Sequence, residues 1–177
     1  TLLGHMIKRR GHKLVIEALR SLPDDVVALF VGAPLRGLEY MVDQFREYAA
    51  KNGVADRTRF MGFVPEEELE RVLAATDVAL APYRSMSASG ALATLISAGR
   101  PIVTSDLPQF RELGAMDPGA FHSFTPYRSE QLAPAIEDAL ATATDEPDPH
   151  VEALARRLST TRVVDRYMGL YRTAASA

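Results

Sequence analysis

Short apolar runs alternate with amphipathic segments along nearly all of this 177-residue chain. The clearest run, VVALFV at 26–31, contains no polar residue, which is typical of a strand buried on both faces of a sheet. Segments between the runs carry apolar residues at helical spacing, as in 33–53. Because alternating strands and helices with short connections form a parallel sheet covered on both faces, the sequence predicts an α/β fold: a doubly wound parallel sheet of about six strands.

Two predicted helices near the C-terminus carry local signals. The segment 129–144 is amphipathic but contains Pro134, which we expect in the first turn, where a missing N–H costs little. Residues 151–177 are expected to form one long helix that bends near Ser159.

Residues 77–106 are predicted to form a strand, a loop of small residues, a helix and a second strand. The loop places Ser87, Ser89 and Gly90 directly before the helix. Because these side chains are small, the backbone of the loop is accessible. Unpaired N–H groups and the positive end of the helix dipole favour an anion at such a helix start. We therefore expect an anion-binding site here.

Composition and missing motifs exclude several classes of function. A formal net charge of -3 argues against nucleic acid as the main partner. The chain has no cysteine, and its four histidines are not spaced with carboxylates as metal ligands, so we expect no metal site. No window of 18 apolar residues predicts a membrane span. The glycine motifs of dinucleotide-binding proteins, P-loop NTPases and serine hydrolases are absent.

Four loops that follow predicted strands carry glycine, basic or small residues. In a doubly wound sheet the carboxyl ends of the strands share one rim, where ligands bind. The basic turn at Arg10 and the helix start at Ser89 suit phosphate, and glycines in the other loops let a flat ring approach the backbone. Together the four loops predict a nucleoside-diphosphate site.

Several motifs occur in one order along the chain. Residues 4–11 read GHMIKRRG, residues 59–64 read RFMGFV, residues 76–83 read TDVALAPY, residues 98–106 read AGRPIVTSD, and residues 167–171 read YMGLY. In this order they resemble motifs in the C-terminal domain of family 4 (group 1) glycosyltransferases, which have the GT-B fold. The resemblance implies a Rossmann-like domain that binds a nucleotide sugar.

The resemblance also implies an activity: transfer of a sugar from a UDP- or GDP-linked donor to an unknown acceptor, with no metal or other cofactor. Arg10 takes the place of a family lysine on the donor phosphates and is the candidate catalytic residue. His5 stands where the family usually has a second cation, and the loop at 62–64 is expected against the base. The predicted donor-binding residues are His5, Arg10, Gly11, Gly32, Gly62, Phe63, Val64, Ser87, Ser89, Gly90, Ala91 and Thr94.

The chain departs from the family at a pair of glutamates, E-x7-E, whose positions hold Met86 and Thr94. In the family the first contacts the donor sugar and the second the ribose. Thr94 can offer a hydroxyl to a ribose, whereas Met86 cannot replace a carboxylate. Two alternatives therefore stay open: a catalytically degenerate nucleotide-binding domain, and a nucleotide-sugar epimerase of the same architecture. The epimerase needs acid–base groups at the cleft, and the sequence shows no convincing pair.

The resemblance further predicts how the protein is organised. Residues 1–145 form the nucleotide-sugar-binding domain, and residues 146–177 a linker and helix expected to pack toward a missing N-terminal domain that holds the acceptor. Alone, the chain is expected to be inactive. A cytoplasmic location is expected, with any membrane association supplied by the missing domain, and the excess of Arg over Lys hints at a bacterial source.

Overall fold

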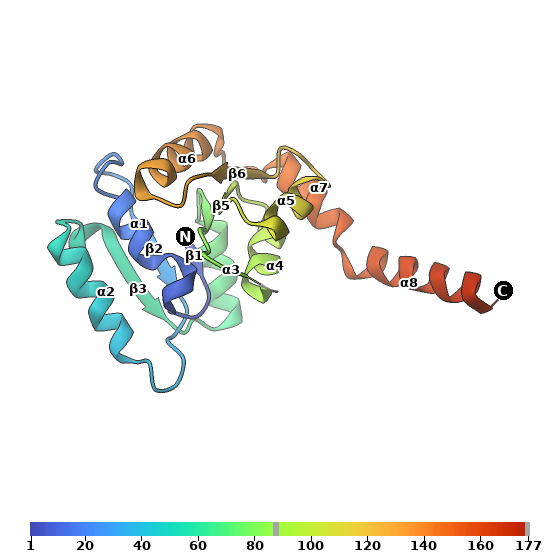
Figure 1. Cartoon of the computed structure of the whole chain (residues 1–177), viewed down its shortest axis with the longest axis horizontal. Coiled ribbons are helices and arrows are strands. Elements are labelled where there is room, and N and C mark those ends of the chain that lie inside the picture. Colours follow the sequence, from blue (N-terminus) through green and yellow to red (C-terminus); the bar gives the residue numbers. More distant parts are fainter. Residues whose placement is uncertain (87–88, 176–177) are drawn as a thin grey trace.

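The computed structural model describes residues 1–86 and 89–175. Its centre is a six-stranded sheet in the order β3-β2-β1-β4-β5-β6, with parallel pairing between neighbouring strands (Figure 1). The strands are β1 (Leu2–Leu3), β2 (Ala28–Val31), β3 (Thr58–Gly62), β4 (Ala79–Ala81), β5 (Ile102–Ser105) and β6 (Phe121–Phe124). The order runs outward from β1 in both directions, as in a doubly wound sheet. The predicted Rossmann-like α/β fold is confirmed.

Helices cover both faces of the sheet (Figure 1). One face packs against α1 (His12–Ala18), α2 (Tyr40–Lys51) and α6 (Ser129–Thr142). The other packs against α3 (Glu66–Ala74), α4 (Gly90–Ser97), α5 (Pro108–Gly114) and α7 (Pro149–Arg157). The short turns η1 (Lys8–Arg10) and η2 (Ala55–Arg57) and the helix α8 (Thr160–Ala175) complete the described elements. Among the residues that the structure describes, none of these helices is long and apolar enough to span a membrane.

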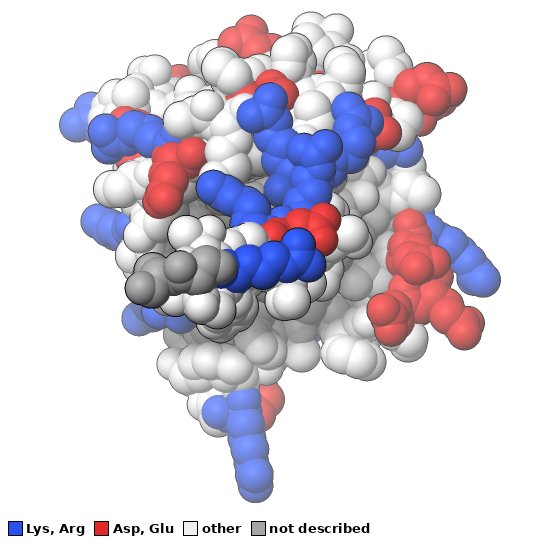
Figure 2. Space-filling view, turned by 90° about the vertical axis from the view of Figure 1, so that its right-hand side faces the viewer, with Lys and Arg blue, Asp and Glu red and all other residues white. Residues whose placement is uncertain are grey.

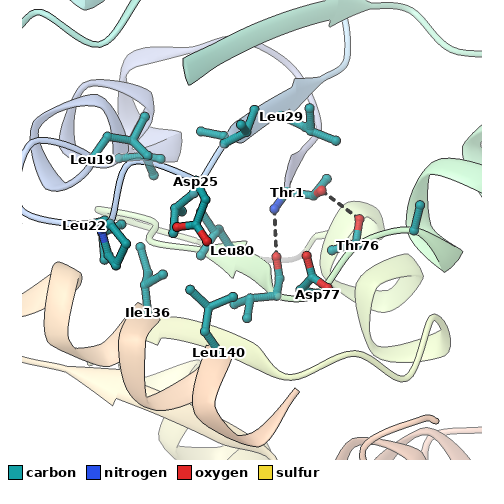
Figure 3. Close-up of a pocket in the computed structure, with 17 residues that line it drawn as sticks. Thr1, Leu19, Leu22, Asp25, Leu29, Thr76, Asp77, Leu80, Ile136 and Leu140 are labelled. Carbon is teal, nitrogen blue, oxygen red and sulfur yellow. Dashed lines mark hydrogen bonds between the residues drawn. The ribbon is translucent and has the colours of Figure 1, made fainter. Parts of the chain in front are cut away.

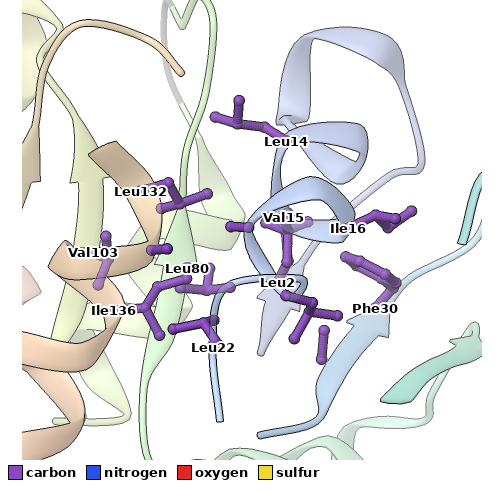
Figure 4. Packing of buried hydrophobic residues seen from close by; sticks show 14 of the residues in the cluster. Leu2, Leu14, Val15, Ile16, Leu22, Phe30, Leu80, Val103, Leu132 and Ile136 are labelled. Atoms are coloured by element: carbon purple, nitrogen blue, oxygen red, sulfur yellow. The ribbon is translucent and has the colours of Figure 1, made fainter. Parts of the chain in front are cut away.

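The hydrophobic core has two layers, one on each side of the sheet, and β1 shows why. Leu2 packs in one layer with Leu80, whereas the next residue, Leu3, packs in the other with Val31. Successive side chains of a strand point to opposite faces, so a strand buried on both sides reads as a continuous apolar run. Figure 4 shows side chains of α1 and α6 closing over the Leu2 layer.

Three helix predictions differ from the structure. The predicted helix at 33–53 begins only at Tyr40, because the segment before it turns at Gly37, whose φ is +83°. Pro134 is the sixth residue of α6 rather than part of its first turn. Pro134 has no N–H to donate to the Glu130 carbonyl, and its ring is exposed to solvent. The single long C-terminal helix is two helices, α7 and α8, separated at residues 158–159, so the predicted bend is a break.

His12 is a titratable residue buried at the start of α1. Its side chain is 1% exposed, and its ring stacks on Phe45 with 4.8 Å between the ring centroids. Neither ring nitrogen has a hydrogen-bond partner among the described residues. Burial is the main reason that the pKa of His12 is lowered to about 4; the nearby Ile7 backbone acts in the opposite direction, and the positive charge of Arg10 lowers the pKa further. The ring is therefore neutral in the folded chain at pH 7.

This neutral ring makes the fold weaker in mild acid. The unfolded chain takes up a proton on His12 below about pH 6.5, and the folded chain only near pH 4. Stability from this residue is thus fully present above pH 6.5 and is lost as the pH falls toward 4. Between pH 7 and pH 5 we expect a loss of about 2 kcal/mol, measured by urea unfolding. In the His12→Leu chain the free energy of unfolding should lack this part of its pH dependence. An equal pH dependence in the two chains would contradict the assignment to His12.

Candidate functional site

The order of the sheet reverses between β1 and β4, and the helices that follow these two neighbouring strands, α1 and α4, lie on opposite faces of the sheet. In doubly wound sheets this switch point opens a crevice at the carboxyl ends of the strands, where ligands bind. The loop after β1 leads into η1, and the loop after β4 leads to the start of α4. Both loops belong to the predicted donor site, and the strand order brings them together.

Arg10 joins these two loops. Its Nη1 donates a hydrogen bond to Ser89 Oγ at 3.2 Å, and its Cζ lies 4.4 Å from the centroid of the Tyr83 ring. Ser89 Oγ also accepts a 3.1 Å hydrogen bond from the Leu92 N–H, which caps α4. The guanidinium is thereby fixed beside the N-terminus of α4. The sequence predicts Arg10 and Ser89 at this site but gives Tyr83 no role.

Glycines let the first three loops of the rim approach closely. A Cβ on Gly4 would lie 3.2 Å from Arg10 Cζ and 3.3 Å from Ala91 Cβ, so Gly4 leaves room for the guanidinium beside α4. A Cβ on Gly32 would lie 2.3 Å from the Gly4 carbonyl oxygen. The Gly32 N–H in turn donates to the Gly62 carbonyl at 2.7 Å. Gly4, Gly32 and Gly62 therefore form a continuous stack of backbone along the rim.

Gly11 holds the other side of η1 in place. Its φ is +88°, and a Cβ there would lie 2.3 Å from the Pro82 carbonyl oxygen. The same carbonyl accepts a 2.8 Å hydrogen bond from the Tyr127 hydroxyl. Burial raises the pKa of Tyr127, so this hydroxyl keeps its proton and remains a donor. Gly11 supports the site through its backbone conformation, and Pro82 and Tyr83 form the wall behind Arg10.

The first turn of α4 offers backbone N–H groups. Gly90 and Ala91 are its first two residues, and N–H groups at this position have no partner within a helix. The Thr94 hydroxyl donates to the Gly90 carbonyl at 3.1 Å, which leaves its oxygen lone pairs to accept a further bond. The half-buried Met86 packs against the hydrophobic layer on this face. Ser87, also predicted for this site, lies outside the described residues.

The remaining predicted residues lie around the rim with different orientations. His5 is exposed, and its Nδ1 lies 3.2 Å from the Ala33 carbonyl, a hydrogen bond when that nitrogen carries the proton. Phe63, after β3, has a side chain that is 80% exposed. Val64 instead packs half-buried against the core, so only its backbone can face a ligand. No hydrogen bond in the described structure joins any of these three to Arg10.

A separate cavity lies away from these residues. It has a volume of about 540 Å³ and opens at the amino ends of β1, β2 and β4, the edge opposite the rim (Figure 3). Its walls are mainly apolar, with Leu22 and Leu140 among them and Asp25 at its mouth. It contains none of the predicted site residues. Within residues 1–86 and 89–175, no three His, Asp or Glu side chains gather as they would around a metal ion.

Residues 1–142 match the family described as glycosyl transferases group 1. Comparison with curated proteins found no match. Among solved structures, the chain is similar to Alr3699/HepE from Anabaena, solved in complex with UDP. The TM-score is 0.77, with 21% identity over 99% of this chain and 48% of that chain.

Two further structures show the same similarity. A glycosyltransferase from Rickettsia africae gives a TM-score of 0.78, with 15% identity over 97% of this chain and 46% of that one. Sucrose-phosphate synthase from Thermosynechococcus elongatus gives a TM-score of 0.76, with 17% identity over 99% of this chain and 45% of that one. The chain thus spans about half the length of the structures it resembles. These similarities show the fold, and the match over residues 1–142 shows that the chain belongs to the group 1 glycosyltransferases.

Proposed function

We propose that this chain is the donor-binding half of an enzyme that transfers a sugar from a UDP- or GDP-linked donor to an acceptor. The observation that carries the proposal is the Arg10 guanidinium, held between Ser89 and Tyr83 beside the start of α4. A fixed cation and a helix N-terminus at a switch point suit a diphosphate. The UDP bound to the similar Anabaena protein supports the same class of ligand.

Each part of the site has a role in this proposal. Sugar transfer leaves negative charge on the departing nucleoside diphosphate, which Arg10 and the N–H groups of Gly90 and Ala91 stabilise. These groups supply the stabilisation without a metal or other cofactor. The exposed ring of Phe63 faces the base, and Thr94 Oγ1 accepts a hydrogen bond from the ribose.

One observation favours a second candidate, a domain that binds the nucleotide without catalysis. Met86 takes the place of a carboxylate that would contact the donor sugar, and its side chain packs against the core. An epimerase has less support. Two candidate acid–base groups near the rim already have partners: His5 lies at the Ala33 carbonyl, and Asp106 pairs with Arg111 at 2.8 Å.

Calorimetric titration of the 177-residue chain with UDP, GDP, UDP-glucose and GDP-mannose tests the donor site. We expect at least one nucleotide to bind, together with its sugar derivative. Failure of all four to bind would overturn the proposal. If nucleotides bind but the complete protein transfers no sugar, the non-catalytic alternative holds.

In this proposal the C-terminal helix α8 packs against a further domain of a larger protein. No residue of α8 is buried, and its apolar side chains, from Val163 to Ala175, fall within an arc of about 160° at 100° per residue. Arg162, Arg166 and Arg172 lie on the opposite side of α8. Figure 1 shows the helix projecting from the domain, and Figure 2 shows basic side chains gathered on that side of the molecule. The apolar arc packs against an N-terminal domain that holds the acceptor and provides any membrane contact, in a cytoplasmic protein.

Deletion of residues 160–177 is therefore expected to change the melting temperature of the chain by about 2 °C or less, because α8 adds no buried residue. The control is Leu154→Ala in α7, where a fully buried side chain is lost at a cost of about 2–5 kcal/mol. Calorimetric melting measures both. A loss of stability in the deletion as large as that of Leu154→Ala would mean that α8 is part of the domain core.

A further inference from the structure

A second cavity, of about 440 Å³, lies at the edge of the sheet that carries the proposed donor site, on the side of α1 and α2. Its size is within the range of pockets that hold small ligands. Leu14 and Phe45 give it an apolar floor, and Tyr127 forms part of its wall. Three cationic side chains line it: Lys8, Lys13 and Arg84. It contains a predicted site residue only at Gly11, and the proposed donor role leaves it unexplained.

The cavity carries an excess of positive charge in a chain whose net charge is -3. Its one carboxylate, Glu17, accepts a hydrogen bond from the Tyr48 hydroxyl. In the part of the chain that the structure describes, none of the three cations forms a salt bridge. Lys13 Nζ lies 4.7 Å from the Tyr48 ring centroid, and Arg84 Cζ lies 5.8 Å from that of Tyr127. Exposed cations that line one hollow without a carboxylate partner favour an anion there.

The wall between this cavity and the proposed donor site is a single short stretch of chain. The turn η1 carries Arg10 toward Ser89 and Lys8 toward the cavity. The Arg84 N–H donates to the Arg9 carbonyl at 2.8 Å, which ties the two loops together. An anion in the cavity would therefore lie next to a donor diphosphate without using Arg10.

We propose that this cavity binds the anionic end of a second small molecule, a phosphate or carboxylate on a body about as large as a monosaccharide. Lysine and arginine donate charge-assisted hydrogen bonds to such groups, and the apolar floor contacts the body. The assignment of this molecule as the acceptor rests on the proposed function, whereas the binding of the anion does not. The rest of the acceptor would then lie in the N-terminal domain.

Calorimetric titration of the 177-residue chain with glucose 6-phosphate, in the presence and absence of UDP, tests this proposal. We expect glucose 6-phosphate to bind and neutral glucose not to bind. The double variant Lys8→Gln/Arg84→Gln should weaken the affinity for glucose 6-phosphate by about tenfold or more, while its affinity for UDP and its melting temperature stay unchanged. The matched control, Lys51→Gln at the far end of α2, should behave as the unchanged chain.

Two results would overturn the cavity as an anion site: no binding of glucose 6-phosphate, or equal binding in the double variant and the unchanged chain. Equal affinity for inorganic phosphate and glucose 6-phosphate would overturn the expected sugar-sized body. Failure of UDP alone to bind bears on the donor site and leaves this proposal standing, because the titration without UDP reads the cavity separately.

Discussion

Replacing Arg10 with alanine is expected to weaken the binding of UDP or GDP by about 10- to 100-fold. A hydrogen bond to a charged group contributes about 1.5–3 kcal/mol, and Arg10 is the cation held at the start of α4. The loss should be larger for the diphosphate than for the nucleoside, since the guanidinium acts on the phosphates. Calorimetric titration of the same nucleotides measures the difference.

Two variants make this result specific. Arg10→Lys keeps the charge but loses the planar group that lies over Tyr83, so we expect an intermediate affinity. Arg46→Ala removes an exposed cation from α2 and should leave nucleotide affinity unchanged. Equal nucleotide affinities in Arg10→Ala and Arg46→Ala would show that Arg10 does not contact the nucleotide.

Replacing Gly32 with alanine is expected to destabilise the fold by about 3–5 kcal/mol and lower the melting temperature by about 10 °C. The added Cβ would lie 2.3 Å from the Gly4 carbonyl oxygen and 2.7 Å from its carbon, in a residue whose φ is +129°. These are backbone atoms between neighbouring strands, so they cannot rotate away as a side chain would. Urea unfolding and calorimetric melting measure the loss.

Gly37→Ala is the matched control for Gly32→Ala. Gly37 also has a positive φ, +83°, but a Cβ there would meet no atom within 4 Å. The Gly37→Ala chain should lose only about 1–2 kcal/mol of folding stability, which is the cost of placing alanine in a left-handed conformation. Equal losses in the two variants would show that backbone strain, and not the close approach of Gly32 to Gly4, limits this position.

Much of the fold could be predicted because its signals are local. The run VVALFV identifies β2, and similar apolar runs identify the strands around it. Helix boundaries were less secure, since the start of α2 depends on a turn at Gly37, and α6 tolerates Pro134 where its ring faces solvent. These helices are stabilised by packing against the sheet, and the spacing of apolar residues in the sequence does not show that packing.

The candidate site was predicted in pieces. Arg10 and Ser89 each carry a local signal, but their contact joins residues 79 positions apart and exists only because β1 lies beside β4. Tyr83 reads in the sequence as the aromatic end of a strand, and only the structure places its ring under the guanidinium. The orientation of Val64, whose side chain faces the core, likewise follows from tertiary packing.

A nucleoside diphosphate is expected to bind where the loops after β1 and β4 meet. Titration of the ¹⁵N-labelled chain with UDP and GDP, followed by amide chemical shifts, tests it most directly. We expect saturable shifts at Gly4, Ser89, Gly90 and Ala91, and their loss in Arg10→Ala. Shifts confined to the opposite edge of the sheet, around Leu22 and Leu140, or no shifts with either nucleotide, would contradict the claim.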